Sequence, residues 1–406
     1  MFGRENEDLK LASGLTGALT SCSNRGLALL VLQPTAFCNL DCGYCYVPDR
    51  NNPARMSLGT LRKVCTALTR SRLVAEAGGF DVLWHAGEPL VAGLPFYRDA
   101  VALFTEAFGT SRRIRQTFQT NATLITEHWC EFFHEVDAEV GISLDGPKDL
   151  HDAQRPRRGG RGSFDDVMRG VAVLRANRIR LNALCVLTPT SLRQPERIFD
   201  FFVSQKIFNV AFNIEETEGA HATSLLTIES TRQDVRRSYE EFMRRFLDRN
   251  EHYHRPLLVR ELYIQSQRLI ARARDRSFEV EEPENFAGRI VTVSREGEVS
   301  SWSPELASGT RCNTRFFSLG NIHSVDCIDE LIEGPRARQM QAEISGGIEL
   351  CRQTCKYFPV CGGGLPSNKF YENGSFIAAE TLRCQLQVQA LTDLLLSRSR
   401  IMGGVA

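Results

Sequence analysis

Long apolar runs are missing from this 406-residue chain, and none approaches the length of about eighteen residues that crosses a bilayer. The N-terminal residues, Met1–Lys10, are charged and carry no apolar core of the kind found in signal peptides. We therefore expect a cytoplasmic protein that makes no contact with a membrane.

A surplus of either charge is also missing. The chain has 49 basic and 49 acidic residues, so its formal net charge at pH 7 is +0. Without a net field the protein has no long-range attraction for a polyanion, and we expect no nucleic acid partner. Its content of 42% hydrophobic and 24% charged residues is ordinary for a folded protein, which argues against disorder.

Cysteine, by contrast, is plentiful, with 13 residues. Clustered cysteines in a cytoplasmic protein bind metal more often than they form disulfides. Cys38, Cys42 and Cys45 lie directly after the apolar run 28–33. Three thiolates can bind three irons of a cubic iron–sulfur cluster and leave the fourth iron open to another ligand. Zinc is also compatible with a thiolate-rich set.

A second cysteine set lies near the C-terminus. Cys351, Cys355, Cys361 and Cys384 supply four thiolates, enough to complete a cluster with no open iron. The glycines at 362–364 let the backbone pass close to sulfur. Taken alone, this set favours a four-cysteine zinc site.

Short apolar runs alternate with helical patterns between Leu29 and Ile214. Strands separated by helices of this length predict βα units and a parallel sheet, which is an α/β fold. Six repeats favour a partial (β/α)6 barrel of the TIM type over a closed eight-stranded barrel. Several polar motifs follow the apolar runs, at the carboxyl ends of the expected strands, where parallel α/β proteins bind ligands.

The pattern along the chain predicts four segments. Residues 1–26 form an N-terminal arm without clear periodicity, and residues 27–226 form the partial barrel. Residues 227–289 are charged and helical in pattern and form a connector. A β-hairpin with glycine in its turn begins at Ile290 and opens a C-terminal domain, residues 290–406.

The first cysteine motif resembles that of the radical S-adenosylmethionine (SAM) superfamily, whose members carry C-x3-C-x-aromatic-C after the first barrel strand. Cys38, Cys42 and Cys45 match the ligands of the superfamily's [4Fe-4S] cluster, whose open iron site binds SAM. Tyr44 matches the aromatic residue beside the SAM adenine. Three further motifs follow in the superfamily's order, which chance would rarely supply.

The motif His85-Ala86-Gly87-Glu88-Pro89 follows an apolar run and resembles the superfamily's GGEP motif, with Ala86 in place of the first glycine. In the superfamily this backbone edge holds the amino group of SAM. The resemblance therefore implies that Gly87 and Glu88 bind the cofactor.

Two more motifs imply further cofactor contacts. The run 119–121 resembles the QTN motif at the end of another strand, and implies a contact from Asn121. The run 143–147 resembles the SLDGP motif. Ser143 and Arg155 match the pair that reaches the SAM ribose and carboxylate in sulfatase-maturase-like members.

The C-terminal cysteine set is similar to that of a SPASM-like α+β domain, which implies at least one auxiliary [4Fe-4S] cluster on these four cysteines. Trp302 and Leu365 stand where the usual pattern has ligands of a second auxiliary cluster, so we expect a single one. Cys312 and Cys327 are left over, either as ligands of a smaller cluster or as structural thiols.

Within the SPASM branch, the runs 303–306 and 351–384 resemble ribosomal-peptide maturases that form cyclophanes. The resemblance implies that a 5′-deoxyadenosyl radical starts a C–C cross-link between an aromatic ring and a side-chain β-carbon of a precursor peptide. It also implies a reductant such as flavodoxin or ferredoxin. The auxiliary cluster is the expected acceptor of the electron released when the ring regains aromaticity.

Cross-linking also needs a proton acceptor. Glu215 and Glu216 follow the expected strand 210–214, and one of them at most faces the cavity, because adjacent strand residues point to opposite faces. Asp145 is a further candidate for the base, although a turn-forming role before glycine and proline fits it as well. We expect His85 to be a hydrogen-bonded structural residue.

Two other functions are compatible with the sequence. A sulfatase-maturase-like enzyme would use the same cofactors to oxidise a Cys or Ser side chain to formylglycine, or would form a thioether. A non-catalytic zinc-binding scaffold with two cysteine sites belongs to a different class. Bound iron and sulfide, together with formation of 5′-deoxyadenosine from SAM, distinguish the enzyme from the scaffold.

Overall fold

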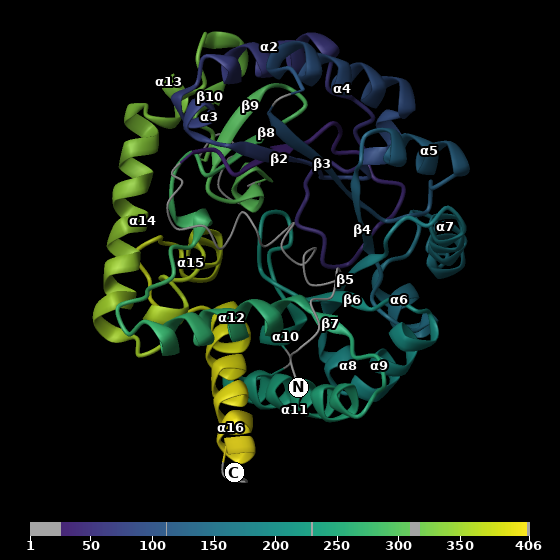
Figure 1. Cartoon of the computed structure of the whole chain (residues 1–406), viewed down its shortest axis with the longest axis vertical. Helices are drawn as coiled ribbons and strands as arrows, with labels where there is room; N and C mark the ends of the chain where they lie inside the picture. Colours follow the sequence, from purple (N-terminus) through teal and green to yellow (C-terminus); the bar gives the residue numbers. More distant parts are fainter. Residues whose placement is uncertain (1–25, 111, 229, 309–316, 404–406) are drawn as a thin grey trace.

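The computed structural model describes residues 26–403 except 111, 229 and 309–316 (Figure 1). Residues 1–25 of the expected N-terminal arm therefore lie outside the described residues. Cys312 lies outside them as well.

One ten-stranded sheet of order β10-β9-β8-β1-β2-β3-β4-β5-β6-β7 forms the centre of the protein. Strands β1 to β8 all run parallel to one another, whereas β9 runs antiparallel to both of its neighbours, β8 and β10. Within the described ranges β7 and β10 are the two edges and the sheet stays open, so the predicted partial barrel is confirmed. The strands are β1 (Leu29–Leu32), β2 (Gly79–Trp84), β3 (Arg113–Thr120), β4 (Glu139–Ser143), β5 (Asn182–Leu187), β6 (Asn209–Ile214), β7 (Leu258–Val259), β8 (Ile290–Val293), β9 (Glu298–Ser301) and β10 (Gly320–Asn321).

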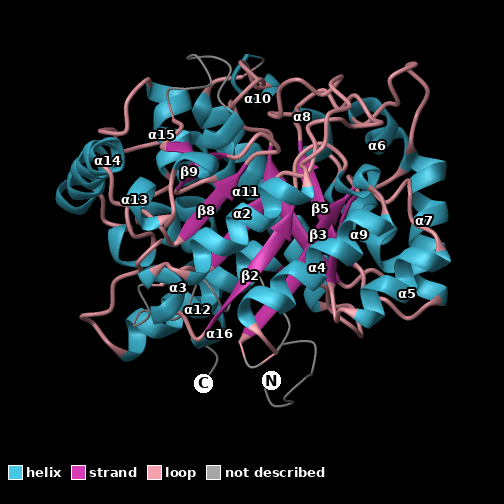
Figure 2. Ribbon diagram, turned by 90° about the horizontal axis from the view of Figure 1, so that it is seen from above, coloured by secondary structure: helices cyan, strands magenta, loops and turns pink. Residues whose placement is uncertain are grey.

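Helices cover the outer face of the curved sheet (Figures 1 and 2). In α2 the residues Leu61, Val64 and Leu68 recur at three- and four-residue intervals and are fully buried, as expected for a helix with one apolar face. The Ser57 side chain caps this helix by accepting the N–H of Thr60. The helices between the barrel strands are α2 (Leu58–Thr69), α3 (Arg72–Glu76), α4 (Leu94–Phe108), α5 (Glu127–Glu135), α6 (Lys148–Gln154), α7 (Phe164–Ala176), α8 (Pro189–Leu192) and α9 (Pro195–Ser204).

The segment expected as a connector forms α10 (Leu225–Ile228), α11 (Arg232–Glu251) and α12 (Arg260–Arg274). The apolar stripe of α11 packs on the barrel. Phe242 and Phe246 lie with their ring centroids 5.5 and 5.1 Å from that of Phe212 on β6. This helix therefore belongs to the outer layer of the barrel.

The expected hairpin is present as β8 and β9, and Gly297 adopts a φ of +87° in its turn. Strand β8 also pairs in parallel with β1, from Leu29 with Ile290 to Leu32 with Val293. The sheet therefore runs through residue 290, and the domain boundary at this point stays a prediction.

The remaining elements follow the hairpin, except η2, which directly precedes it. They are the 3-10 helices η2 (Pro283–Asn285), η3 (Pro304–Ser308) and η6 (Phe358–Val360), the helices α13 (Asp329–Ile332), α14 (Pro335–Thr354), α15 (Pro366–Asn373) and α16 (Leu391–Gly403), and the π-helix η7 (Cys384–Ala390). Figure 1 shows α14 beside the β8–β10 end of the sheet. Among the helices described here, none combines the length and the apolarity that a membrane span requires.

Candidate active site

The loop after β1 carries Cys38, Cys42 and Cys45 as free thiols. Burial, together with the charges of Glu88, Cys42 and Cys45, raises the pKa of Cys38 to about 12. Burial is also the main cause of the pKa of about 11 at Cys42, where Arg155 acts in the opposite direction and Cys45 raises it further. The three thiols therefore lie close enough to resist one another's ionisation. A positively charged iron cluster is a partner that would hold them as thiolates.

Contacts with the barrel fix this loop. Arg158 Nε donates a hydrogen bond of 2.6 Å to the carbonyl oxygen of Cys38. The backbone N–H of Glu88 donates to the carbonyl oxygen of Phe37 at 2.8 Å. A Cβ atom at Gly87, whose φ is +55°, would lie 2.4 Å from that same oxygen, so only glycine fits between the two segments.

Two donors approach the sulfur of Cys38. The backbone N–H of Leu40 lies 3.4 Å and Asn121 Nδ2 lies 3.8 Å from Cys38 Sγ. Asn121 Nδ2 also donates to Asn39 Oδ1 at 2.8 Å, within the same loop. Because hydrogen bonds to the charged form favour ionisation, these donors suit a thiolate that binds metal.

Within the described ranges, no three His, Cys, Asp or Glu side chains converge closely enough to hold a single metal ion. A zinc site draws its ligands to about 2.0–2.3 Å from one point. The thiolates of an iron–sulfur cluster bind different irons and therefore stand farther apart.

Asp145, just beyond the end of β4, is enclosed by donors. Arg155 Nε and its terminal nitrogen donate to the two carboxylate oxygens at 2.9 and 3.1 Å, and Tyr44 Oη donates at 2.5 Å. The N–H of Val186 adds a fourth bond of 3.0 Å. Burial alone would raise the pKa of Asp145, but the Arg155 charge and these hydrogen bonds hold it below the usual value. The carboxylate is therefore ionised and fully occupied in the described structure.

Arg155 and Tyr44 also contact each other directly. The guanidinium carbon of Arg155 lies 5.2 Å from the centroid of the Tyr44 ring, a cation–π geometry. The loop with the three cysteines and the end of β4 are thus joined through Asp145, because this carboxylate accepts from both side chains.

Glu88 joins the ends of β2 and β3. Its buried carboxylate accepts from the N–H of Leu90 at 3.0 Å, from Thr120 Oγ1 at 2.7 Å and from the N–H of Asn121 at 2.7 Å. Burial raises the pKa of Glu88 to about 7, although these hydrogen bonds act in the opposite direction. The side chain of Glu88 is therefore used within the protein, as are its backbone N–H, which donates to Phe37, and its carbonyl oxygen, which accepts the N–H of Val91 at 3.1 Å.

The other residues matched to SAM contacts lie at the same edge. Gly87, Asn121 and Ser143 lie at or just beyond the carboxyl ends of β2, β3 and β4, which are neighbours in the sheet. Ser143 Oγ accepts a bond of 3.1 Å from Gln119 Nε2. Carboxyl ends of adjacent parallel strands meet at one edge, so the fold brings these three residues into one region. Their contact with SAM stays a prediction.

The four C-terminal cysteines come from the end of α14, the turn after η6 and the start of η7. The charges of Cys361 and Cys355 act on Cys351, and Cys361 shares a hydrogen bond with Cys384, so the four thiols lie together. That hydrogen bond lowers the pKa of Cys361 and raises that of Cys384. Lys369 Nζ lies 3.4 Å from Cys351 Sγ and favours a thiolate there.

Trp302, which departs from the usual SPASM pattern, and the left-over Cys327 both make contacts within the protein. Trp302 is fully buried, and its ring N–H donates to Gln341 Oε1 at 3.0 Å, so it packs in the core. Cys327 donates its S–H to the carbonyl oxygen of Arg70 at the end of α2. Because Cys312 lies outside the described residues, a cluster shared by Cys312 and Cys327 stays untested.

Four glutamates lie near enough beyond the carboxyl end of β6 for their charges to act on one another, and we call them the carboxylate cluster. Glu216 and Glu218 follow β6, Glu284 lies in η2 and Glu305 lies in η3. Burial is the main reason that the pKa of each is raised, and repulsion within the group adds to it at Glu216, Glu218 and Glu284. Only Glu216 was predicted from the sequence. The other three come from separate segments, although the two-residue spacing of Glu216 and Glu218 is typical of side chains on one face of a strand.

Two further residues contact the carboxylate cluster. Arg383 Nε lies 3.6 Å from Glu216 Oε1, and Asn368 Nδ2 donates to Glu218 Oε1 at 2.9 Å. Arg383 directly precedes Cys384, so the cluster lies next to the C-terminal cysteine set. The charge of Cys361 also acts on Arg383, in agreement with this placement.

Glu215 points into its own loop. Its Oε1 accepts the N–H of Leu225 at 2.9 Å and lies 3.1 Å from His221 Nε2. Glu216 instead faces Arg383, so these two neighbours point in different directions.

Tyr46 connects the three-cysteine loop to the carboxylate cluster. Burial and the charges of Glu305, Cys45 and Glu218 raise the pKa of its phenol well above the usual value. Its Oη lies 2.7 Å from Nε2 of His85. Burial lowers the pKa of His85 to about 4, so this histidine is neutral at pH 7 and hydrogen-bonded.

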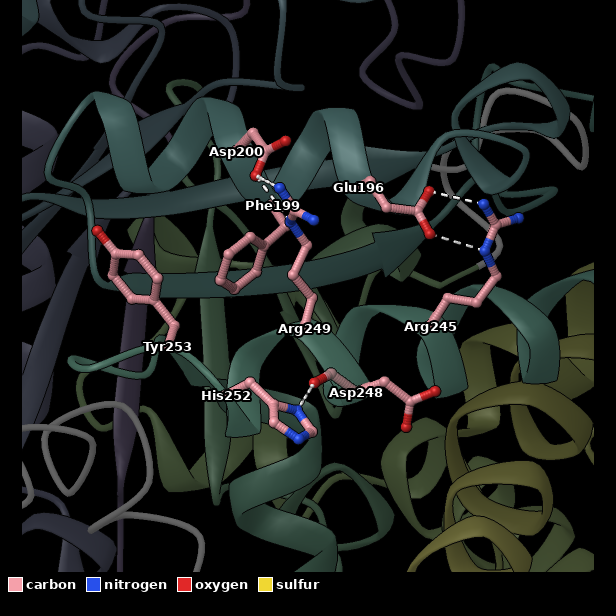
Figure 3. A pocket seen from close by; sticks show the side chains of 8 residues that line it. All are labelled: Glu196, Phe199, Asp200, Arg245, Asp248, Arg249, His252 and Tyr253. Atoms are coloured by element: carbon pink, nitrogen blue, oxygen red, sulfur yellow. Dashed lines mark hydrogen bonds and ion pairs between the residues drawn. The ribbon is translucent and has the colours of Figure 1, made fainter.

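A separate surface pocket of about 470 Å³ lies between α9 and α11 (Figure 3). Its charged side chains pair across the two helices, Arg245 with Glu196 and Arg249 with Asp200. Both helices belong to the outer layer of the barrel, so this pocket is not part of the strand-end site.

The geometry agrees with comparisons to known proteins. The sequence pattern of the Radical SAM superfamily matches residues 32–202. The chain is also 38% identical over 373 residues to the uncharacterized protein sll1766 of Synechocystis sp. (strain ATCC 27184 / PCC 6803 / Kazusa), covering 91% of each chain. This chain belongs to the radical SAM superfamily. It is therefore an enzyme of a family that uses a [4Fe-4S] cluster and SAM.

A serine-type anaerobic sulfatase-maturating enzyme of Bacteroides thetaiotaomicron is 32% identical over 211 residues, which cover 49% of this chain and 50% of that enzyme. The chain thus spans about half the length of that relative. This radical SAM enzyme is accordingly related to the sulfatase maturases.

Two solved structures share the fold. Native anSMEcpe with bound AdoMet and Cp18Cys peptide has a TM-score of 0.72 at 21% identity, over 93% of this chain and 99% of that chain. Streptococcus suis SuiB bound to precursor peptide SuiA has a TM-score of 0.58 at 16% identity, over 88% and 76%. These likenesses concern the fold.

Proposed function

We propose that this radical SAM enzyme modifies a ribosomally made precursor peptide, and that it joins an aromatic ring to a side-chain β-carbon by a C–C bond. The observation that carries the proposal is that the segment with Glu216 and Glu218 contacts both cysteine regions. Ala220 donates its N–H to the carbonyl oxygen of Tyr46, next to Cys45, and Glu216 lies 3.6 Å from Arg383, next to Cys384. Solved structures of the same fold that hold peptides add support.

In this proposal Cys38, Cys42 and Cys45 hold a [4Fe-4S] cluster with one open iron. The four C-terminal cysteines hold an auxiliary [4Fe-4S] cluster. All seven cysteines of the two sets are free thiols, and thiolate is the ligand that holds iron–sulfur clusters. When bound, the two clusters and SAM supply a radical that takes hydrogen from an unactivated carbon and an acceptor for one electron.

The strand ends would hold SAM, and each matched residue has a distinct task. The Gly87 and Glu88 backbone supports the methionine end, where a side chain at Gly87 would collide with the loop. Tyr44 lies beside the adenine. Asp145 is the positioning residue for Tyr44 and Arg155, because it accepts from both side chains. The full group of proposed cofactor contacts is Tyr44, Gly87, Glu88, Asn121, Ser143 and Arg155.

The cross-link removes two hydrogens from the peptide, one from the β-carbon and one from the ring carbon that it joins. The first leaves as a hydrogen atom, and the second leaves as one proton and one electron. We assign the proton to Glu216, which faces Arg383, in preference to Glu215 and Asp145. The oxygens of Asp145 and one oxygen of Glu215 already accept hydrogen bonds from neighbouring residues.

Co-expression with a candidate precursor, such as a small reading frame beside the gene with repeated aromatic motifs, tests the reaction. Mass spectrometry should show loss of two hydrogens for each cross-linked motif, and fragmentation should fail between the joined residues. An unchanged peptide mass would contradict the proposal.

A sulfatase-maturase-like reaction is the second candidate, favoured by the identity to the Bacteroides thetaiotaomicron enzyme. Oxidation of a Ser side chain to formylglycine also removes two hydrogens, as does thioether formation from a Cys thiol. A hydrazide reagent labels the aldehyde, and iodoacetamide shows whether a thiol has been lost. A C–C cross-linked peptide should resist the hydrazide and keep any thiol it had.

Two further parts of the proposal concern partners and location. We propose a flavodoxin or a ferredoxin as the electron donor, and a cytoplasmic location. We also propose that the chain divides into an N-terminal arm (residues 1–26), a partial barrel (27–226), a helical connector (227–289) and an auxiliary-cluster domain (290–406).

A further inference from the structure

We propose that the carboxylate cluster binds a cationic side chain, an ammonium or a guanidinium, of the peptide substrate. The inference rests on the proposed peptide modification and adds to it the chemistry of the substrate residue.

The charge of the region is unbalanced. Four carboxylates meet there, and Arg383 is the cation that acts on all four. The neighbouring Arg268 and Arg232 are already paired with other carboxylates, Glu282 and Glu372. In the free protein burial and mutual repulsion raise the pKa of these glutamates, so they resist ionisation, and a bound cation would favour their ionised form.

Unpartnered acceptors mark the place of the ligand. Asn368 is 1% exposed, and its amide nitrogen donates to Glu218. Asn368 Oδ1, on the same amide, is buried and has no hydrogen-bond partner among the described residues, and the same holds for Glu284 Oε2. The amide oxygen of Asn368 accepts hydrogen bonds only, and so does a carboxylate oxygen of Glu284 in its ionised form, so a donor can fill both places.

The missing donor is larger than a metal ion. No three acidic side chains in the described ranges come within the spacing of a single-ion site. An ammonium has three N–H donors and a guanidinium has five, and either group can reach several separated oxygens at once. Guanidinium and ammonium groups therefore suit this arrangement better than a bare cation.

The position connects the ligand to the reaction. The backbone N–H of Ala220, two residues after Glu218, donates to the carbonyl oxygen of Tyr46 at 2.8 Å, and Tyr46 directly follows Cys45, so the cluster borders the three-cysteine loop. A peptide side chain held there would place neighbouring peptide carbons close to the radical site. The cluster would thus set which peptide residue is presented.

Small cations test the site without a known peptide. The Tm of the anaerobically reconstituted enzyme is measured with n-butylguanidinium, and with n-butylurea, its neutral counterpart, at equal concentration and ionic strength. The expected result is a Tm rise of about 2 °C or more with the cation alone. In Glu218→Gln and Glu305→Gln the apparent dissociation constant should increase about tenfold.

Glu106→Gln is the matched control, because Glu106 is an exposed carboxylate paired with Arg62 on the outer layer. It should keep the full response to n-butylguanidinium. Equal Tm changes with n-butylguanidinium and n-butylurea would overturn the proposal, and so would an undiminished response in the Glu218 and Glu305 variants.

The precursor peptide provides the second arm. Replacing the recognised Lys or Arg of the peptide by norleucine should raise KM about tenfold for the wild-type enzyme and have little effect in Glu218→Gln. A modified segment without Lys or Arg would overturn the inference. If the proposed peptide modification itself were wrong, the peptide mass would stay unchanged while the response to n-butylguanidinium persisted, so the two failures are distinguishable.

Discussion

The substitution Asp145→Asn tests whether the strand-end network is built on one buried ion pair. Asp145 accepts two hydrogen bonds from Arg155 at 2.9 and 3.1 Å, and the two side chains are only 3% and 7% exposed. Asparagine has nearly the same shape but no charge, and its amide N–H group would face the guanidinium. The variant therefore leaves the Arg155 charge buried without its partner.

The expected cost follows from burial. Removing one partner of a buried pair costs about 3–5 kcal/mol. The hydrogen bonds from Tyr44 and Val186 are also weakened, because the amide offers a single acceptor oxygen. We therefore expect Asp145→Asn to lower the free energy of unfolding by about 3–5 kcal/mol at pH 7, and to reduce SAM cleavage because Tyr44 and Arg155 lose their positions.

The matched control is Asp149→Asn. Asp149 also accepts two hydrogen bonds from one arginine, Arg197, at 2.8 and 3.1 Å. These side chains are 60% and 52% exposed, so this substitution should cost no more than about 1 kcal/mol. Urea unfolding of both variants and of the wild type, at one pH and ionic strength, measures the difference. Equal losses in the two variants would refute the argument from burial.

The remaining predictions concern the cysteines, one glycine and the carboxylate cluster. Cys42→Ala should abolish 5′-deoxyadenosine formation, measured by chromatography, whereas Cys384→Ala should impair peptide product but keep some SAM cleavage; full activity in the Cys42 variant would contradict the cluster assignment. Gly87→Ala should lose most of its iron, measured by metal analysis, because the new Cβ would collide with the carbonyl oxygen of Phe37. Burial raises the pKa of Glu218, so the native state holds a proton that the unfolded chain has lost above about pH 4.3, and stability should fall as pH rises from there. Glu218→Gln should reduce this fall and be more stable than the wild type at pH 8 in thermal unfolding; an unchanged pH profile would argue against the buried charge.

The barrel could be predicted well because the sequence patterns that indicate its strands and helices are local. Alternating apolar runs and helical stripes, such as the one on α2, reflect periodicities of a few residues, and they place the motifs at the carboxyl ends of the strands. The turn at Gly297 is local as well, since its positive φ follows from the two strands that it connects.

Contacts between distant segments could not be predicted in this way. The carboxylate cluster combines Glu218 with Glu284 and Glu305, and no periodic pattern relates these positions. The pairing of β8 with β1 joins segments about 260 residues apart, so the hairpin looked like the start of a separate unit. The enclosure of Asp145 depends on Arg155 and Val186. Its position before a glycine and a proline is compatible both with a general base and with a turn-forming residue, so the sequence alone could not decide between these two roles.

Product formation from SAM tests the central claim most directly. Anaerobically reconstituted wild-type protein and a variant with Cys38, Cys42 and Cys45 all replaced by alanine are incubated with SAM and dithionite, and 5′-deoxyadenosine is measured. The account predicts an iron–sulfide chromophore and 5′-deoxyadenosine for the wild type, and no 5′-deoxyadenosine for the variant. Colourless wild-type protein that forms none, or equal formation by both proteins, would contradict it.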